Sequence, residues 1–517
     1  MATIRSAEMM GRSAWLGRAL AMCVTVVGAL LTAGAAMAQP QGVAEWRMGH
    51  EAQIVQELRE LVSLPNVAGV DADMRRNAAQ LQSLFTKRGF KVELIEGTGS
   101  PVVVATLDTP NASGTLTFYI HYDGLAVDPT EWTKCKPFAP CLWSATGPVP
   151  DDSTRTRFDP QWRLYGRSAS DDKGPIVAFL SAVDALRATA AGPTWNLRVV
   201  LDGEEEADYA QFRRYAETRP AALQSDLAIM LDGPRHPSGR PTVFFGVRGE
   251  SGLLLTVFGA VRDLHSGNYG NWAPDPSMRL AKLLSTMKDD DGRVLIKDFY
   301  KDVRALTAAE VAALAAAPNV ESVLARDFGV AQPERPGERL EAKLNQPTLS
   351  ILELGTSGLR GRSAIPGSAS ARLEVRLVKD LTSDVQNQLI VEHIRAQGYY
   401  VVTSRNPTDE ERRAHRLIAR VDPRVPTPVS RSPLDDPRAQ SVVKALTMRG
   451  VSPVQLPTLG GSMPFWVFRD GFKMPTVGIS IANFDNNQHG PDENLRLQEL
   501  WEGIEMLAAV MSMPKSQ

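Results

Sequence analysis

The sequence predicts an α/β protein in which a mixed, mostly parallel sheet is flanked by helices and an α+β domain is inserted. Two observations carry this prediction. Short apolar runs alternate with amphipathic segments in residues 45–248, and the same texture returns in residues 433–517. Between them, residues 249–432 also contain predicted strands and helices, but their pattern of apolar and polar residues differs. Alternation of strands and helices is typical of a parallel sheet covered by helices, so the outer segments are expected to form one discontinuous domain.

Length and composition are those of a globular protein. The chain has 517 residues, of which 43% are hydrophobic and 22% are charged, which excludes disordered, collagen-like and coiled-coil chains. At roughly 150 residues per domain, about three domains are expected. The net charge of −2 gives no electrostatic reason to expect nucleic acid or an anionic membrane as the main partner.

The first 38 residues have the pattern of a secretory signal peptide. Arg5, Arg12 and Arg18 precede an uncharged stretch over residues 19–38 that ends in Ala-Met-Ala. A basic segment, an apolar segment and a small-residue cleavage site are the parts of such a signal. An N-terminal membrane anchor is the alternative, because the uncharged stretch is just long enough to span a bilayer. We favour cleavage after Ala38, which predicts a secreted or periplasmic protein without stable membrane association.

The first part of the chain is expected to hold short buried strands and the helices that cover them. Apolar residues at helical spacing predict helices over residues 53–61, 77–87 and 175–189. Short continuous apolar runs predict four buried strands, over residues 102–107, 116–120, 197–201 and 227–231.

The inserted region and the last part of the chain also show strands and helices. In the insertion, strands are expected over residues 252–258, 371–378 and 399–404, and helices over residues 276–287 and 383–397. Thr307 and Glu310 form a capping box ahead of an Ala-rich helix over residues 311–317. The alternating pattern of the first part of the chain then recurs. It predicts a helix over residues 439–449 and strands over residues 454–456 and 476–481.

Cys135 and Cys141 bracket a short Pro-rich loop. In an exported protein, a disulfide that closes this loop is favoured over two free thiols.

Metal-binding side chains follow three of the predicted strands and also lie in two polar loops. The strand ends carry His121 and Asp123, the acidic run Asp202 to Glu206, and Asp232, while the loops carry Asp171 and His489. Ligands gather at the carboxyl ends of strands in open α/β sheets, so these residues are expected to converge. Two imidazoles with several carboxylates suit two ions such as Zn²⁺, whereas an all-oxygen Mg²⁺ or Ca²⁺ site would not require the histidines.

Each motif alone has a structural alternative. A His-x-Asp pair is usually a structural histidine or a surface pair, a Glu triplet is usually solvated, and an Asp-Asp-Lys-Gly turn can be a helix N-cap. However, the adjacent carboxylates of Glu204, Glu205 and Glu206 would repel one another unless cations neutralise them. The joint occurrence of the motifs at strand and loop ends favours a metal site.

The combined motifs resemble the M20 family of di-zinc metallopeptidases, in its carnosinase-like dipeptidase and glutamate carboxypeptidase branch. They are His121-Tyr-Asp123, Gly166-Arg-x-x-x-Asp171-Asp172-Lys173-Gly174, Glu204-Glu205-Glu206, Asp232 and His489. The resemblance covers nearly the whole chain after the signal segment. It implies a zinc exopeptidase-like catalytic domain, residues 45–248 and 433–517, with an inserted lid and dimerisation domain, residues 249–432.

The resemblance also implies a set of metal ligands. His121 and Asp232 would bind one Zn²⁺, Glu206 and His489 would bind the other, and Asp171 would bridge both ions. Mn²⁺ and Co²⁺ are the alternative metals.

Two further carboxylates take supporting roles in this resemblance. Asp123 would orient His121, and Glu205 would act as general base. Because three glutamates follow one another, the family's Glu pair could correspond either to Glu204 and Glu205 or to Glu205 and Glu206. Glu205 and Glu206 are chosen because the family's Glu pair is followed by a small residue, Gly and Ser, although this chain has Ala-Asp-Tyr209 there.

The insertion carries residues that the resemblance relates to the substrate. His265 matches the lid histidine that reaches a neighbouring subunit's active site and stabilises the oxyanion, which implies a homodimer. A hydrogen-bonded turn histidine is the equal alternative. Arg376 matches the lid arginine that pairs with a substrate carboxylate, although it could also be a surface arginine on an edge strand. Gly461 and Ser462 match a Gly-Gly-Ser-x-Pro loop that contacts substrate.

The expected function is an exported di-zinc hydrolase that cleaves a peptide bond near a free carboxylate. A dipeptidase or carboxypeptidase is favoured over an N-acyl amino-acid amidohydrolase, so the expected substrate is a small peptide or, in the alternative, an N-acyl amino acid. A homologue that binds ligand without catalysis is the remaining alternative, against which the intact ligand set argues.

Overall fold

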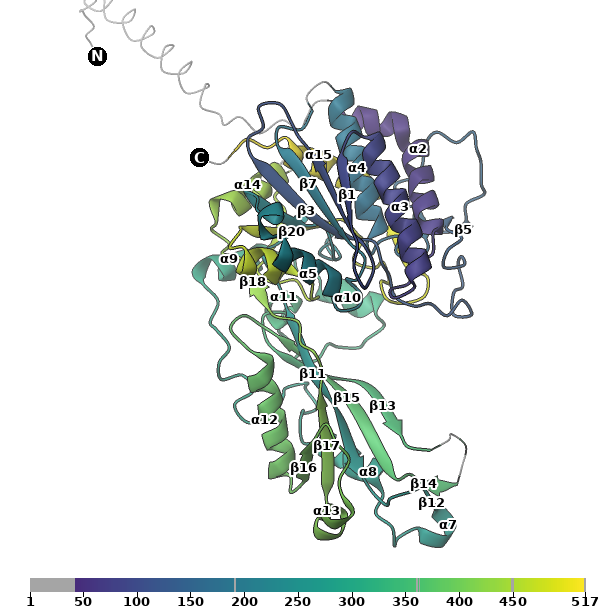
Figure 1. Cartoon of the computed structure of the whole chain (residues 1–517), viewed down its shortest axis with the longest axis vertical. Coiled ribbons are helices and arrows are strands. Elements are labelled where there is room, and N and C mark those ends of the chain that lie inside the picture. Colours follow the sequence, from purple (N-terminus) through teal and green to yellow (C-terminus); the bar gives the residue numbers. More distant parts are fainter. Residues whose placement is uncertain (1–41, 190–191, 359–360, 362, 448–450, 516–517) are drawn as a thin grey trace, which may run out of the picture.

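The protein, described from a computed structural model, consists of two bodies that follow one another along its long axis (Figure 1). The structure describes residues 42–189, 192–358, 361, 363–447 and 451–515. The upper body in this view contains a large sheet covered by helices, and the lower body contains a smaller sheet. The predicted signal peptide, residues 1–38, lies outside the described residues.

An eight-stranded mixed sheet forms the centre of the upper body. Its strand order is β1 (Lys91–Ile95), β2 (Val102–Leu107), β7 (Asn196–Asp202), β3 (Thr115–His121), β8 (Leu227–Met230), β20 (Thr476–Ser480), β9 (Thr242–Phe244) and β19 (Val454–Leu456). The central strands β7, β3, β8 and β20 are parallel, whereas β1 and β2 pair with each other, and β2 with β7, in antiparallel fashion. The carboxyl ends of the four central strands therefore lie at one edge of the sheet.

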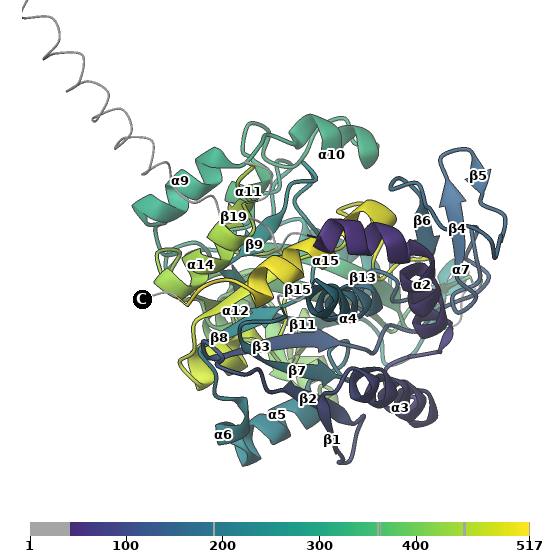
Figure 2. The same ribbon diagram turned by 90° about the horizontal axis from the view of Figure 1, so that it is seen from above.

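Both faces of this sheet are buried, because successive side chains alternate between two apolar cores. In β2, Val103 and Ala105 join the core formed with α2 (Val43–Ser63), α3 (Asp71–Lys87), α4 (Lys173–Ala188) and α15 (Leu497–Met511). Val102 and Val104 join the opposite core, which includes Phe212 of α5 (Ala210–Thr218). Figure 2 shows α2, α4 and α15 on one side of β3, and α5 with α6 (Pro220–Leu223) on the other.

A five-stranded sheet forms the lower body. Its order is β13 (Thr348–Thr356), β15 (Ser368–Leu377), β11 (Gly249–Phe258), β17 (Ile418–Pro423) and β16 (Tyr400–Thr403). Along β15 the residues alternate between buried and half-buried, as expected for a sheet with one face on a core. That core is completed by α8 (Pro276–Leu284) and α12 (Ser383–Ala396).

Three helices of the inserted region lie beside the upper body rather than on the lower sheet (Figure 1). They are α9 (Ala308–Ala316), α10 (Glu321–Asp327) and α11 (Leu340–Lys343). α9 contacts β19, and both hydrogen bonds of the predicted capping box between Thr307 and Glu310 are present. The insertion thus contributes structure to both bodies, and the boundaries of residues 249–432 stay a prediction.

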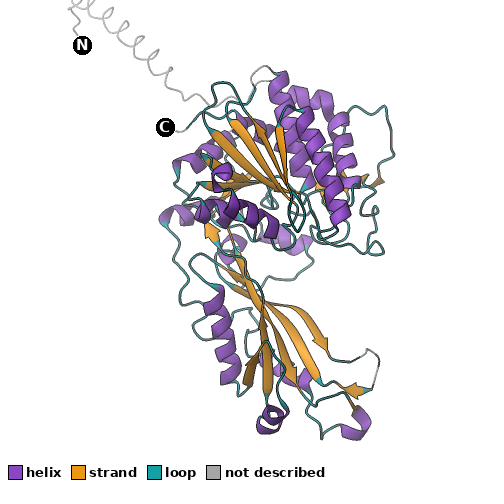
Figure 3. Cartoon of the chain, in the orientation of Figure 1, coloured by secondary structure: helices purple, strands orange, loops and turns teal. Residues whose placement is uncertain are grey.

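Short elements complete the two bodies. The upper body also holds the sheet β21 (Asn494–Arg496), β6 (Arg163–Tyr165), β4 (Cys141–Ser144) and β5 (Gly147–Pro148), the pair β10 (Gly246–Val247) and β18 (Ser430–Arg431), α14 (Pro437–Ala445) and the π-helical turn η1 (Val467–Gly471). The lower body holds the pair β12 (Leu264–His265) and β14 (Ala364–Ile365), with α7 (Ser266–Tyr269) and α13 (Asp409–Ala414). Figure 3 shows that most of the helices belong to the upper body.

The predicted fold class is confirmed. The four predicted buried strands correspond to β2, β3, β7 and β8, with ends that differ by at most one residue. The C-terminal helix α15 was not predicted. Almost all of its residues are buried, so no polar stripe marks its helical period.

Within the described ranges, no single helix is long and apolar enough to cross a membrane. Only α9 and α10 together, bent by 58°, meet the length and composition of a span.

Candidate metal centre and active site

One cavity of about 740 Å³ lies at the carboxyl ends of the central strands. His121 and Asp202 are the last residues of β3 and β7, and the other predicted strand-end residues lie in the loops that follow β3, β7 and β8. Asp171 precedes α4, and the turn before β21 carries His489. The cavity is lined in part by Asp171, Glu205, Glu206, Asp232 and His489. The sheet topology thus brings together residues that are far apart in the sequence.

The candidate ligands form two groups that share Asp171. Ligand atoms of His121, Asp171 and Asp232 all lie within 4.8 Å of one another, and so do those of Asp171, Glu206 and His489. His121 Nε2 is 2.8 Å from Asp171 Oδ1, whereas His489 Nε2 is 3.3 Å from Asp171 Oδ2 and 3.5 Å from Glu206 Oε1. Each oxygen of Asp171 therefore faces a different group, which is the arrangement that a bridging carboxylate requires.

Asp123 connects the histidine to the acidic turn. Its carboxylate is fully buried, with Oδ1 3.3 Å from His121 Nδ1. The same carboxylate accepts hydrogen bonds from the backbone N–H of Glu205 at 3.2 Å and of Glu206 at 3.0 Å. Asp123 can therefore orient the imidazole and fix the turn that carries the other two carboxylates.

The three adjacent glutamates occupy different environments. The carboxylate of Glu204 accepts hydrogen bonds from the backbone N–H of Ser100 at 2.8 Å and of Gln211, in the first turn of α5, at 2.9 Å. Glu205 and Glu206 line the cavity, and Glu204 is absent from the described residues that line it. Glu204 therefore caps α5, while its two neighbours face the site.

Glu493 is a buried residue of the site to which sequence reasoning gave no role. Its carboxylate is fully buried and accepts five hydrogen bonds from the loop that ends at Asp171. The donors are the N–H groups of Ser168, Ser170 and Asp171, the Ser170 hydroxyl and the Arg167 guanidinium, at 2.9–3.1 Å. Glu493 thus holds the loop of Asp171 against the turn of His489. The sequence did hold an indication that Glu493 belongs to the site, because it lies four residues after His489 in the same polar turn.

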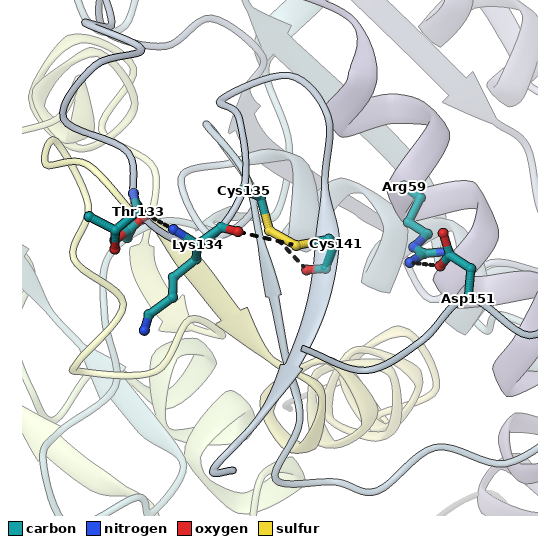
Figure 4. Close-up of a disulfide and its surroundings, with 7 residues drawn as sticks. Arg59, Thr133, Lys134, Cys135, Cys141 and Asp151 are labelled. Carbon is teal, nitrogen blue, oxygen red and sulfur yellow. Dashed lines mark hydrogen bonds and ion pairs between the residues drawn. A yellow bond between two sulfur atoms is a disulfide. The ribbon is translucent and has the colours of Figure 1, made fainter. Parts of the chain in front are cut away.

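A disulfide loop supports that turn from the other side. Cys135 and Cys141 form the expected disulfide, and Thr133 and Lys134 lie directly before it (Figure 4). The backbone N–H groups of Thr133 and Lys134 both donate to Asp492 Oδ1 at 2.9 Å. The loop therefore anchors the residue next to Glu493.

Burial shifts the pKa values of the candidate ligands. Burial and the nearby carboxylate of Asp171 raise the pKa of Glu206 to about 8 and that of Asp232 to about 6. Burial also raises the pKa of Glu205 well above its ordinary value. Although burial opposes it, hydrogen bonds from the two histidines lower the pKa of Asp171. The hydrogen bond to Asp171 raises the pKa of His489 to about 9.

The donor set fits two divalent cations. Two imidazole nitrogens and three carboxylates suit Zn²⁺ as well as Mn²⁺ or Co²⁺. Without cations, the carboxylates repel one another and retain protons, so two positive charges would relieve this repulsion. These observations fit a dinuclear site.

The predicted substrate-binding residues lie on the wall of the same cavity. Arg376 of β15, Gly461 and Ser462 all line it, and an Nη atom of Arg376 donates to Ser462 Oγ at 2.9 Å. Arg376 also pairs with Glu374 at 2.9 Å and with Glu250 at 3.4 Å. Two further arginines that sequence reasoning missed, Arg372 and Arg424, line the cavity as well.

The structure does not bring His265 to this cavity. His265 is exposed in β12 at the lower end of the lower body (Figure 1), and its Nδ1 accepts a hydrogen bond from Gly267 N–H at 3.1 Å. Among the described residues, His265 is not one of those that line the cavity. Within one subunit it is a hydrogen-bonded turn histidine.

Two other residues of the cavity wall were missed. His236 Nε2 lies 2.8 Å from Glu341 Oε1, and this buried pair joins the loop after Asp232 to α11. Glu341 could not be found from sequence, because only the fold brings it beside His236.

Comparisons with known proteins identify relatives that match most of the chain. The sequence model of peptidase family M20/M25/M40 matches residues 117–513. The chain is 24% identical over 432 residues to the Beta-Ala-His dipeptidase of Homo sapiens, covering 79% of this chain and 76% of that one. It is 25% identical over 479 residues to the Cys-Gly metallodipeptidase dug1 of Schizosaccharomyces pombe, covering 88% and 94%.

The fold is shared with a solved peptidase structure. The M20 family metallo-carboxypeptidase Sso-CP2 from Sulfolobus solfataricus superposes with a TM-score of 0.72 at 25% identity, covering 89% of this chain and 99% of that one. The family includes dinuclear metal-binding peptidases.

The prediction of a secreted or periplasmic protein is wrong by these comparisons. The named relatives that match most of the chain are dipeptidases of human and yeast cells, which have no bacterial periplasm. The residues on which the prediction rested, 1–38, lie outside the described part of the chain.

Proposed function

The chain belongs to peptidase family M20/M25/M40, and from this premise we propose that it is a di-zinc dipeptidase that cleaves a peptide bond near a free carboxylate. One observation carries the proposal: two ligand groups share Asp171 in a cavity that Glu205 and Arg376 also line. Relatives named for the dipeptides β-Ala-His and Cys-Gly support a dipeptide substrate.

The metal ligands in this proposal are the two groups around Asp171. His121 and Asp232 would hold one Zn²⁺, Glu206 and His489 would hold the other, and Asp171, which belongs to both groups, would serve both ions. When bound, the two cations acidify a water molecule and polarise the scissile carbonyl. Asp123 keeps the His121 imidazole in the tautomer that leaves Nε2 free to bind metal.

Glu205 is the general base. Its carboxylate takes a proton from the attacking water as the water oxygen bonds to the carbonyl carbon. Glu205 then delivers that proton to the leaving amine as the C–N bond breaks. Its raised affinity for protons suits a group that must carry one between two steps.

Arg376 binds the substrate carboxylate. Its planar guanidinium can hold a carboxylate with two hydrogen bonds, while Gly461 and Ser462 shape the neighbouring wall. Arg372 and Arg424 add positive charge to the same cavity.

The experiment that tests the function combines a substrate panel with Glu205→Gln. We expect the metal-loaded enzyme to hydrolyse dipeptides, and Glu205→Gln to lower kcat by at least about 100-fold with unchanged metal content, because proton transfer is lost. Glu217→Gln is the matched control, because it alters an exposed carboxylate of α5 that is not among the described residues lining the cavity. Turnover of N-acyl amino acids alone would indicate a deacylase, and no turnover on any panel would indicate a binding protein.

His265 completes the active site of a second subunit in this proposal. Its exposed position at the tip of the lower body leaves it available to another chain. We expect His265→Ala and Glu205→Gln to be inactive separately and to regain activity when mixed and reassembled, because each mixed dimer has one complete site. A monomer with full activity in sedimentation would contradict the assignment.

A further inference from the structure

The turn after the candidate ligand Glu206 has an unusual backbone conformation. Tyr209 has φ 57° and ψ 21°, in the left-handed region that bulky residues rarely adopt. Such conformations persist where the surroundings hold them, and they concentrate at functional sites. Tyr209 is a bulky residue, so backbone preference does not explain this conformation.

Hydrogen bonds on both sides fix this conformation. The backbone N–H of Tyr209 donates to the Glu204 carbonyl at 3.0 Å, and the Tyr209 carbonyl accepts from Arg213 N–H in α5 at 2.8 Å. Glu204 is itself anchored through its carboxylate to Ser100 and Gln211. The turn is therefore held in place independently of the tyrosine ring.

This conformation directs the ring toward the catalytic carboxylate. The Tyr209 hydroxyl donates to Glu205 Oε1 at 3.1 Å, and both residues line the cavity. Within the described residues, no other donor lies at hydrogen-bond distance from the Glu205 carboxylate. Tyr209 is thus the residue that fixes its orientation.

Glu205 has a particular need for such a donor. It lies among like charges, because Glu206, Asp232 and Asp123 all act on it. A carboxylate in this setting would rotate away from its neighbours unless a donor held one of its oxygens. With Oε1 bonded to Tyr209, Oε2 stays available to exchange a proton.

We propose that Tyr209 is a positioning residue that orients the general base Glu205. The inference rests on the proposed function, because it acts through the assigned base. The tyrosine keeps its own proton throughout and transfers none. It determines how often the carboxylate faces the attacking water, so it affects the chemical step rather than substrate binding.

The test compares Tyr209→Phe with Tyr215→Phe in the metal-loaded enzyme. Tyr215 is a buried tyrosine of α5, the helix that follows Tyr209 directly, and it joins the core behind the sheet, so it controls for the loss of a hydroxyl. We expect Tyr209→Phe to lower kcat about ten-fold, as for the loss of one hydrogen bond to a charged group, with unchanged KM and metal content. Tyr215→Phe should keep the wild-type kcat.

A double-mutant cycle shows whether Tyr209 acts through Glu205. In the Glu205→Asp background, the shorter carboxylate no longer meets the hydroxyl, so the effect of Tyr209→Phe on kcat should be smaller than in the wild type. The same fold-loss in both backgrounds, or a wild-type kcat for Tyr209→Phe, would overturn the inference.

Glu205→Gln, measured in the same assays, distinguishes a wrong assignment of the general base from a wrong role for Tyr209. If Glu205→Gln is inactive and Tyr209→Phe behaves as the wild type, only the role of Tyr209 fails. If Glu205→Gln keeps full turnover, the assignment of the base fails and the inference fails with it.

Discussion

At the scale of single residues, the candidate metal site depends on side chains outside the two ligand groups. Glu493 shows this most clearly, because five hydrogen bonds join its carboxylate to the loop that positions Asp171. An amide in its place would direct an NH₂ group at donors and would break part of this set.

We therefore expect Glu493→Gln to weaken metal binding by about 10- to 100-fold, a loss typical of residues that orient metal ligands. Metal affinity measured by competition with a chelating dye tests this. Glu505→Gln is the control, because Glu505 is also buried and paired with an arginine, but on α15. Wild-type metal affinity in Glu493→Gln would show that the hydrogen bonds to Asp171 are dispensable.

From the sequence, candidate residues could be predicted where the residue type alone indicates the chemistry. Histidines and carboxylates at strand ends indicate a metal site, and the structure places all five candidate ligands in two groups. The partners of Arg376 could not be predicted, because Glu250 meets it through the pairing of β11 with β15, and Ser462 meets it through the packing of the two bodies. The role of Glu204 also needed the structure, since only hydrogen bonds to Ser100 and Gln211 distinguish it from its neighbours.

At the scale of elements, strands were easier to predict than connections. The buried strands of the large sheet are continuous apolar runs with sharp ends. The segment of residues 141–165 forms β4, β5 and β6, which are short and partly exposed, so no apolar run marks them. The position of α9 beside β19 is a tertiary contact that helical spacing alone cannot give.

The disulfide loop is an element whose effect extends to the site. A cross-link across so short a loop contributes about 2 kcal/mol to the free energy of unfolding. Thr133 and Lys134, which directly precede Cys135, donate hydrogen bonds to Asp492. Loss of the disulfide should therefore also loosen the turn that carries His489.

We expect the double variant Cys135→Ser/Cys141→Ser to unfold at a lower Tm and to lose metal to a chelator faster than the wild type. Differential scanning calorimetry and metal release kinetics check the two effects. A phosphine reductant should have the same effect on the wild type and none on the double variant. Unchanged metal release would show that the loop contributes stability alone.

At the scale of the whole molecule, the charge of the site links stability to pH. The pKa values of Glu206 and His489, about 8 and about 9, and of Asp232, about 6, are all raised in the folded state. The folded metal-free protein therefore binds more protons than the unfolded chain, and its free energy of unfolding falls as pH rises through these values.

Bound cations would prevent this fall in the free energy of unfolding at high pH, because they would replace the protons as the positive charges of the site. We expect the difference in Tm between metal-loaded and chelator-treated protein to be larger at pH 9 than at pH 6. Thermal unfolding at both pH values measures it. A difference that shrinks with rising pH would contradict the assignment of these residues as ligands.

The order of the ligands along the chain has a consequence for biosynthesis. His121, Asp171 and Asp232 are made before the inserted region, whereas His489 and the core helix α15 are made only after it. A nascent chain can pair most of the large sheet while the second ligand group still lacks its histidine. In the proposed site, the second cation can then be captured only after His489 has been made, so a chain interrupted before that residue can hold at most one of the two ligand groups.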